Sequence, residues 1–273
     1  MQQELQKITQ LTHTEFQHYL QHDKPQLLLD LIQSLQNTDP MIRDDFGYQT
    51  LFHCLRQQLL TSEQLTFLTH QLRDLLTLHD TEDAVFARSY AALLLADVIA
   101  LDTEQQQIEP TCMQQTLVHI SSFLMYENDT RNFVEGKGWA NAIPFGADAT
   151  IAAIKHPLFD DKTVPKILHG VKHILQLHTV YTHDEDERAA IILETLAHQQ
   201  IPEPLLIEWV TQVFEQLNYT LFESGYTDHF FKQRTNTLHV LKTLYFYLKV
   251  KRCMPLLQET LYAYITQWHR LNA

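Results

Sequence analysis

The sequence has 273 residues, 45% of them hydrophobic, so it is long enough to bury a substantial core. Its formal net charge of −13, from 33 acidic against 20 basic residues, argues against nucleic acid or an anionic membrane as a partner. Six glycines and nine prolines are fewer than a sheet-rich fold of this length usually needs for its turns.

The three cysteines, Cys54, Cys112 and Cys253, lie far apart and form no CxxC pair. Such spacing is typical of free thiols in a reducing compartment. The first 13 residues are polar and lack the apolar core of a signal peptide. The longest apolar run, Ala91–Leu101, is shorter than a membrane span and contains an aspartate. The sequence therefore predicts a cytoplasmic protein that does not associate with membranes.

Helix signals recur along the whole chain. Asp39 followed by Pro40 predicts a helix start, and Thr61 with Gln64 predicts a capping box. Apolar residues recur at three- and four-residue spacing in segments 27–35, 65–76, 85–101, 189–197, 205–217 and 238–248. No segment alternates with period two. We therefore expect an all-α fold of roughly a dozen helices joined by short linkers.

A weak repeat is visible in the helix openings that begin at Asp39, Glu82, Val134, Asp184 and Asp228. A basic residue follows each opening, and successive bases are 45 to 51 residues apart; they are Arg43, Arg88, Lys137, Arg188 and Arg234. This period matches a helix pair of the HEAT or armadillo type. The sequence predicts a right-handed α-solenoid, an α–α superhelix of such pairs, in one domain over 1–273. Capping helices at 1–38 and 254–273 would flank about five repeats at 39–253.

The five bases admit two interpretations. They can be structural, linking neighbouring repeats and complementing the acids in helical first turns. Alternatively, they line a concave surface that meets an acidic or phosphorylated partner.

Several catalytic signatures are absent. The sequence contains no GxxxxGK[ST], GxGxxG, GxSxG or HExxH motif. His169 and His173 form an HxxxH pair that could share a helix face and bind one metal, but no third ligand is near in sequence, and a solvated helix face explains the pair as well. We therefore predict no cofactor and no metal.

The segment Tyr226–Cys253 is basic and rich in aromatic residues. That combination fits an anionic partner. Because its aromatic residues are also spaced as a helix core requires, a packed core with a solvated basic face is the alternative.

The least ordinary segment is KGWANAIPFGAD, Lys137–Asp148. On a helix, Trp139 would join an apolar stripe, while Asn141, Phe145 and Asp148 would share another face. Pro144 lacks an N–H, so the helix should kink there or begin only there. The small residues around it allow another backbone to approach closely. The segment fits either close helix packing or a ligand or partner pocket.

The segments DPMIRDDFGYQTL, VFARSYAALLLADVIALD, KGWANAIPFGAD and DEDERAAIILETL resemble signature segments of a bacterial family, domain of unknown function 2785. The resemblance covers roughly Asp39 to Leu196, and KGWA and GAD are its most specific parts. It implies an all-helical, repeat-like cytoplasmic protein and no particular activity.

The resemblance also points to one departure. Members of that family often carry histidine at the positions of Asn141 and Phe145, which with Asp148 would make a face able to hold a metal. Asparagine is a weak ligand and phenylalanine is none, so this chain would have lost such a site or would use other residues.

The function we expect is a protein- or peptide-binding scaffold without catalytic activity. The alternative is an enzyme, or a small-ligand or metal-binding protein, with a pocket at the Trp139–Asp148 helix. The candidate ligand- or partner-binding residues are Arg43, Arg88, Trp139, Asn141, Asp148 and Arg188.

Overall fold

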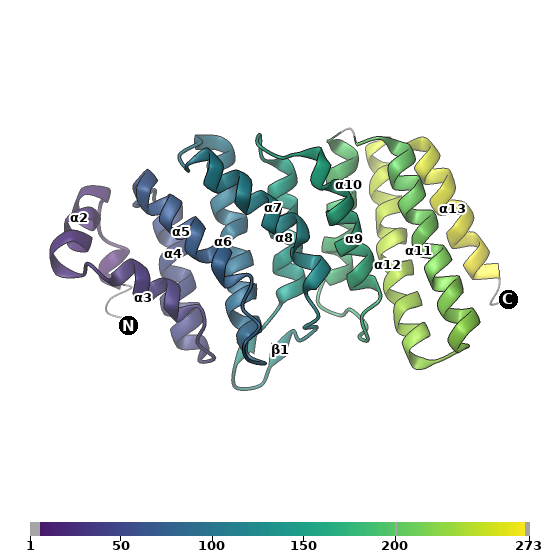
Figure 1. Cartoon of the computed structure of the whole chain (residues 1–273), viewed down its shortest axis with the longest axis horizontal. Coiled ribbons are helices and arrows are strands. Elements are labelled where there is room, and N and C mark those ends of the chain that lie inside the picture. Colours follow the sequence, from purple (N-terminus) through teal and green to yellow (C-terminus); the bar gives the residue numbers. More distant parts are fainter. Residues whose placement is uncertain (1–5, 200, 271–273) are drawn as a thin grey trace. The chain divides into compact units, whose positions relative to one another are not determined.

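The computed structural model describes residues 6–199 and 201–270. It is 75% helical, so the prediction of an all-α fold is confirmed (Figure 1). The one sheet among the described residues is a two-stranded antiparallel hairpin of β1 (Phe133–Val134) and β2 (Gly138–Trp139). Strands of two residues are too short to produce an alternating pattern, which is why the sequence did not predict them.

The chain forms two compact units. The first comprises residues 1–123 and 129–159, and the second comprises residues 124–128 and 160–273. The predicted single domain over 1–273 stays a prediction. Its capping segments at 1–38 and 254–273 include residues 1–5 and 271–273, which lie outside the described residues.

In the first unit the helices are α2 (His13–His18), η1 (Tyr19–Asp23), α3 (Leu27–Ser34), η2 (Met41–Tyr48), α4 (Gln49–Arg56), α5 (Ser62–Leu75), α6 (Ala84–Gln105), most of α7 (Pro110–Tyr126) and α8 (Ala142–Lys155). In the second unit the end of α7 is followed by η3 (Asp161–Thr163), α9 (Val164–Leu175), α10 (Glu185–His198), α11 (Glu203–Ser224), α12 (Asp228–Lys251) and α13 (Pro255–Arg270).

The predicted helix starts are present. The Thr61 side chain accepts from the Gln64 N–H at 3.3 Å and the Gln64 side chain accepts from the Thr61 N–H at 2.9 Å, which completes the capping box of α5. Asp39 Oδ1 accepts from the Met41 N–H at 2.9 Å at the start of η2. The helix that begins there is a π-helix, a form often found at functional sites.

The central helix of the first unit is α6, which packs chiefly against α8. Small residues on α8, among them Gly146, Ala147 and Ala149, let the two helices approach closely. The apolar run Ala91–Leu101 is shorter than a membrane span, but α6 as a whole is long and apolar enough to cross a membrane by length and composition alone. However, 72% of its most apolar window is buried inside the structure, as in the core helix of a soluble protein.

A buried pair ties the C-terminal ends of α6 and α8 together. His156 Nε2 lies 3.2 Å from Asp102 Oδ2, and the two side chains are 1% and 3% exposed. The other carboxylate oxygen of Asp102 accepts from the Ile108 N–H at 2.8 Å. His156 Nδ1 accepts from the Leu158 N–H at 3.1 Å, so the ring proton lies on Nε2 and is donated to Asp102.

The segment before α8 corrects one expectation. Trp139 lies in β2 and not on a helix, because α8 begins only at Ala142. Asn141 precedes it with a left-handed backbone, φ 48°. Pro144 therefore lies in the first turn of α8, where its missing N–H costs no helical hydrogen bond. Of the two predicted alternatives, a kink or a start at Pro144, the structure has a helix start, which lies at Ala142, two residues earlier.

Gly138→Ala should lower the free energy of unfolding by about 1–3 kcal/mol. Gly138 has φ +77°, and an added Cβ would lie 3.0 Å from Arg43 Nη2 and 3.4 Å from Pro40 Cβ. The change therefore combines backbone strain with steric crowding. Urea denaturation measures the effect. Gly136→Ala is the control, since Gly136 shares the positive φ (+76°) but has nothing within 4 Å of the added Cβ. If both variants lost the same free energy of unfolding, crowding at Arg43 would not contribute to the effect of Gly138→Ala.

Close packing of helices and hydrogen bonds from buried side chains stabilise the second unit. A Cβ on Gly170 of α9 would lie 3.2 Å from the Met125 backbone N, so the absence of a side chain helps α9 to pack closely against the end of α7. Trp209 Nε1 donates to the Leu168 carbonyl at 2.7 Å. The fully buried Asn236 side chain donates to the Thr179 carbonyl at 2.9 Å.

Candidate functional site

Arg43 is completely buried and joins three segments of the first unit. Its Nε donates to Asp44 Oδ1 at 2.7 Å, its Nη1 to the Asn37 carbonyl at 3.2 Å and its Nη2 to the Lys137 carbonyl at 2.8 Å. The guanidinium also lies 4.4 Å from the centre of the Phe86 ring. These contacts favour the structural interpretation of Arg43, because its donors are engaged within the protein.

The other periodic bases occupy different environments. Arg88 is 5% exposed and donates to the Leu78 carbonyl at 2.8 Å. Lys137 forms an ion pair with Asp83, with 2.6 Å between Nζ and Oδ2. Arg188 is half-buried in the second unit. Arg234 is half-buried as well. Two of the five bases are thus buried and three are not, which favours structural roles over a common binding surface.

The two polar candidates of KGWANAIPFGAD lie close to the start of α8. Asn141 is half-buried, and its side-chain oxygen is buried without a hydrogen-bond partner in the structure. Asp148 is half-buried on α8, two turns further along. Trp139 is 40% exposed and packs edge-on against Phe133, with 5.2 Å between ring centres. Trp139 therefore stiffens the hairpin and is not a core residue.

Asp148 belongs to a group of residues contributed by three elements. We call this group the acidic–aromatic face; it consists of Tyr48, Tyr90, Asp97, Phe145 and Asp148. The Tyr90 ring meets the Tyr48 and Phe145 rings edge-on, with 5.9 Å between the ring centres in each case. Tyr90 is 5% exposed, while the other four members are half-buried. The face thus exposes parts of two aromatic rings and of two carboxyl groups to solvent.

The carboxylates of this face influence each other. Burial, and secondly the charge of Asp148, raises the pKa of Asp97 to about 6. Asp97 Oδ2 is buried and accepts no hydrogen bond in the structure. Burial, and secondly the charge of Asp97, raises the pKa of Tyr48 to about 12. The negative charge at Asp97 is thus poorly compensated by the protein itself.

Asp97→Asn should raise the free energy of unfolding by about 1–2 kcal/mol at pH 7, a value discounted for partial exposure. The pKa of Asp97 is raised when the chain folds, so the ionised carboxylate opposes folding. Wild type should regain this stability as the pH falls through about 6 towards 4, where Asp97 is protonated in the folded state. Urea denaturation of both proteins at pH 7 and pH 4 measures the difference. A gain that is as large at pH 4 as at pH 7 would contradict the assignment.

Two pockets lie elsewhere, and no residue of α8 lines either of them. One, in the first unit, has a volume of about 920 Å³. The other, of about 340 Å³, lies in the second unit between α9 and α11 and includes His169 and His173. His173 Nε2 lies 3.1 Å from the Glu127 carbonyl oxygen. Within residues 6–199 and 201–270, no three histidine, cysteine or acidic side chains are grouped to hold a metal.

A family model described as Protein of unknown function (DUF2785) matches residues 73–246, more than half of the chain. The chain belongs to the DUF2785 family. No curated protein and no solved structure matches it significantly. The matched segment of this DUF2785 protein contains Arg88, Trp139, Asn141, Asp148 and Arg188, whereas Arg43 lies outside it.

The sequence indicates two of the five residues of the acidic–aromatic face of the DUF2785 protein and not the other three. Asp148 and Phe145 were singled out, but Tyr48, Tyr90 and Asp97 were not. Asp97 had a usable signal, because it is the one charged residue in the apolar run Ala91–Leu101. Tyr48 and Tyr90 had none, because their approach to α8 depends on tertiary packing.

Proposed function

We propose that this DUF2785 protein is a non-catalytic scaffold that binds a basic segment of a partner protein on the acidic–aromatic face. The observation that carries the proposal is the pair of half-buried carboxyl groups of Asp97 and Asp148, of which Asp97 accepts no hydrogen bond at Oδ2. The raised pKa of Asp97 agrees with this arrangement. A lysine or arginine side chain placed beside the exposed parts of the two carboxylates would offset the repulsion between them.

The aromatic members of the face support the same partner. The half-buried rings of Tyr48 and Phe145 offer faces to which a guanidinium or ammonium group is attracted. The formal net charge of −13 would also steer a basic segment towards the protein. We keep the cytoplasm as the proposed location, and the partner is to be sought there.

As part of this proposal, we infer that the helices stack as a right-handed α-solenoid of HEAT- or armadillo-like pairs. Within each unit, helices two places apart pack together, as α6 does with α8, α10 with α12 and α11 with α13. Stacking of this kind is how helix pairs form a continuous core. A small-angle scattering profile typical of a near-spherical particle would argue against the solenoid.

The test is fluorescence anisotropy with a labelled peptide, Gly-Arg-Leu-Arg-Gly, compared with its neutral analogue Gly-Gln-Leu-Gln-Gly. We expect only the basic peptide to bind, and binding to weaken as the pH falls through about 6, because Asp97 then loses its charge. The double variant Asp97→Asn/Asp148→Asn should bind at least about tenfold more weakly, which corresponds to about 1.4 kcal/mol.

The matched control removes the same charge elsewhere. Glu215 and Glu223 are exposed on α11, so Glu215→Gln/Glu223→Gln removes the same two negative charges without touching the face. Its affinity for the basic peptide should stay close to that of wild type. Equal losses in the two double variants would reduce the binding to general charge attraction and contradict the proposal.

An enzyme is the second candidate, and the same pair of carboxylates favours it. A carboxyl group with a pKa of about 6 beside an ionised carboxylate is a common arrangement for acid–base catalysis. Such an enzyme would need a cavity at α8 in addition, and the two pockets described lie elsewhere. The scaffold therefore remains the function that we propose.

A further inference from the structure

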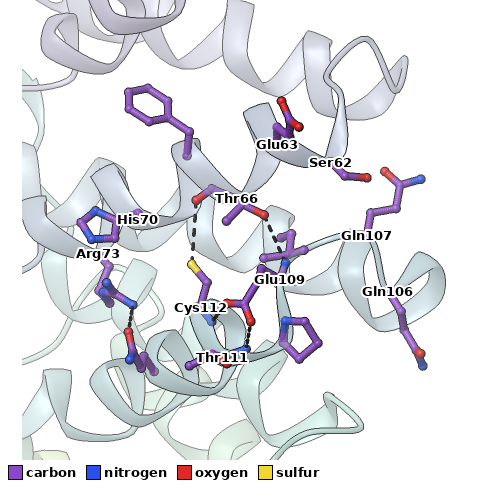
Figure 2. Close-up of a pocket in the computed structure, with 14 residues that line it drawn as sticks. Ser62, Glu63, Thr66, His70, Arg73, Gln106, Gln107, Glu109, Thr111 and Cys112 are labelled. Carbon is purple, nitrogen blue, oxygen red and sulfur yellow. Dashed lines mark hydrogen bonds between the residues drawn. The ribbon is translucent and has the colours of Figure 1, made fainter.

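The larger of the two described pockets lies in the first unit. It is formed by α5, the loop after α6 and the start of α7, and it shares no residue with the acidic–aromatic face. Figure 2 shows the side chains that line it. Arg73 and His70 lie at one side of the pocket, while Ser62 and Glu63 lie at the other (Figure 2). The volume of about 920 Å³ is sufficient for a small organic molecule.

Arg73 is the unusual member of this lining. It is only 8% exposed, and its Nη1 donates to Gln115 Oε1 at 2.9 Å. Among the described residues, no carboxylate forms an ion pair with it, and the neighbouring Asp74 pairs with His70 at 3.2 Å. A buried guanidinium usually has an anionic partner, because desolvating an unpaired charge is costly. Arg73 therefore leaves a buried positive charge at the wall of the pocket without a counter-charge.

The acids of the pocket do not fill this role. Glu109 caps α7, and its carboxylate oxygens accept from the Thr111 N–H at 2.9 Å and the Cys112 N–H at 2.6 Å. Glu63 is exposed and lies across the pocket from Arg73 (Figure 2). Two acids in the lining would repel a dianion such as phosphate, whereas a single carboxylate placed at Arg73 avoids most of that repulsion.

The rest of the wall is suited to an apolar group. Phe67 is 43% exposed although it is a large hydrophobic residue, and it lines the pocket together with Ile108 and Pro110. A ligand that combines an apolar body with one negative charge would cover Phe67 and neutralise Arg73 at the same time.

We propose that this pocket binds a small organic acid, with its carboxylate paired to Arg73 and its apolar body against Phe67 and Pro110. Neither the family nor the function proposed above assigns a site here. The two proposals can fail separately, because they use different residues and different ligands.

The experiment uses 4-phenylbutyrate as the probe and 4-phenylbutanamide, which has the same body without the charge, as its neutral match. Amide chemical shifts of the full chain are recorded by NMR during titration with each compound. We expect the carboxylate alone to shift the amides of Arg73, Thr111 and Gln115. Equal shifts with both compounds, or none up to the solubility limit of the carboxylate, would overturn the proposal.

Variants separate the charge from the cavity. Arg73→Gln should weaken binding of 4-phenylbutyrate at least tenfold, and Arg73→Lys, which keeps the charge, should restore part of it. Because Arg73 is buried, its replacement can also affect folding, so a second variant is needed. Thr111 is exposed at the pocket, and its side chain and backbone N–H both bond to Glu109. Thr111→Trp removes the side-chain bond but keeps the backbone N–H that caps α7, so it should block the pocket and leave the fold intact. Undiminished binding in a folded Thr111→Trp or Arg73→Gln protein would show that the ligand lies elsewhere.

Discussion

Arg43→Ala is expected to lower the free energy of unfolding by about 4–5 kcal/mol, the upper end of what single changes do. The variant loses every hydrogen bond of the guanidinium, including the one to the Lys137 carbonyl at 2.8 Å. It also leaves a cavity beside Phe86 and removes the charge that pairs with Asp44 at 2.7 Å. Urea denaturation followed by circular dichroism measures the loss.

Two further variants show whether geometry or charge matters at this position. Arg43→Lys keeps the charge but cannot reach three acceptors with one planar group, so it should recover only part of the loss. Arg56→Ala removes an exposed arginine from α4 and should change stability by no more than about 0.5 kcal/mol. A loss below about 1 kcal/mol in Arg43→Ala would mean that the three segments hold together without it.

Asp102→Ala should cost about 3–5 kcal/mol, because it removes the acceptor of two buried donors. The Ile108 N–H and His156 Nε2 both lose their partner in a site where the side chains are 3% exposed or less. Water cannot replace Asp102 without entering the core between the ends of α6 and α8. The same denaturation experiment measures the effect.

Asp102→Asn provides the matched comparison. The amide can still accept from the Ile108 N–H, but its NH₂ group would face the Nε2 proton of His156. The histidine cannot readily move that proton to Nδ1, because Nδ1 accepts from the Leu158 N–H. The asparagine variant should therefore lose less than the alanine variant and still be less stable than wild type. An asparagine variant as stable as wild type would contradict the proton assignment on His156.

The helical class could be predicted from the sequence because its signals are local. Apolar spacing in segments such as 85–101, the Thr61–Gln64 capping box and the scarcity of glycine all act within one helix. The hairpin before α8 could not be predicted in this way. Its strands have two residues each, and its position depends on the contact of Lys137 with Arg43, 94 residues earlier in the chain.

The site residues likewise divide into those with a local sequence signal and those whose position depends on tertiary packing. Asp148 was accessible to sequence reasoning because the residues around it are unusual. The periodic bases suggested a common surface, but a sequence period cannot show whether a side chain points into the core, as Arg43 and Arg88 do. The pKa of Asp97 depends on burial and on a charge 51 residues away in sequence, and only the packing of α6 on α8 brings the two together.

The apolar character of α6 has a consequence for synthesis of the chain. Its partner α8 begins at Ala142, so during translation α6 is complete well before the helix that covers it has emerged. In that interval the nascent chain carries, with one side uncovered, the one described helix that is long and apolar enough to cross a membrane. Such segments are bound by chaperones and drive aggregation. A chain cut after Tyr126 should therefore accumulate in the insoluble fraction, and extending it to Phe159, the end of the first unit, should restore solubility.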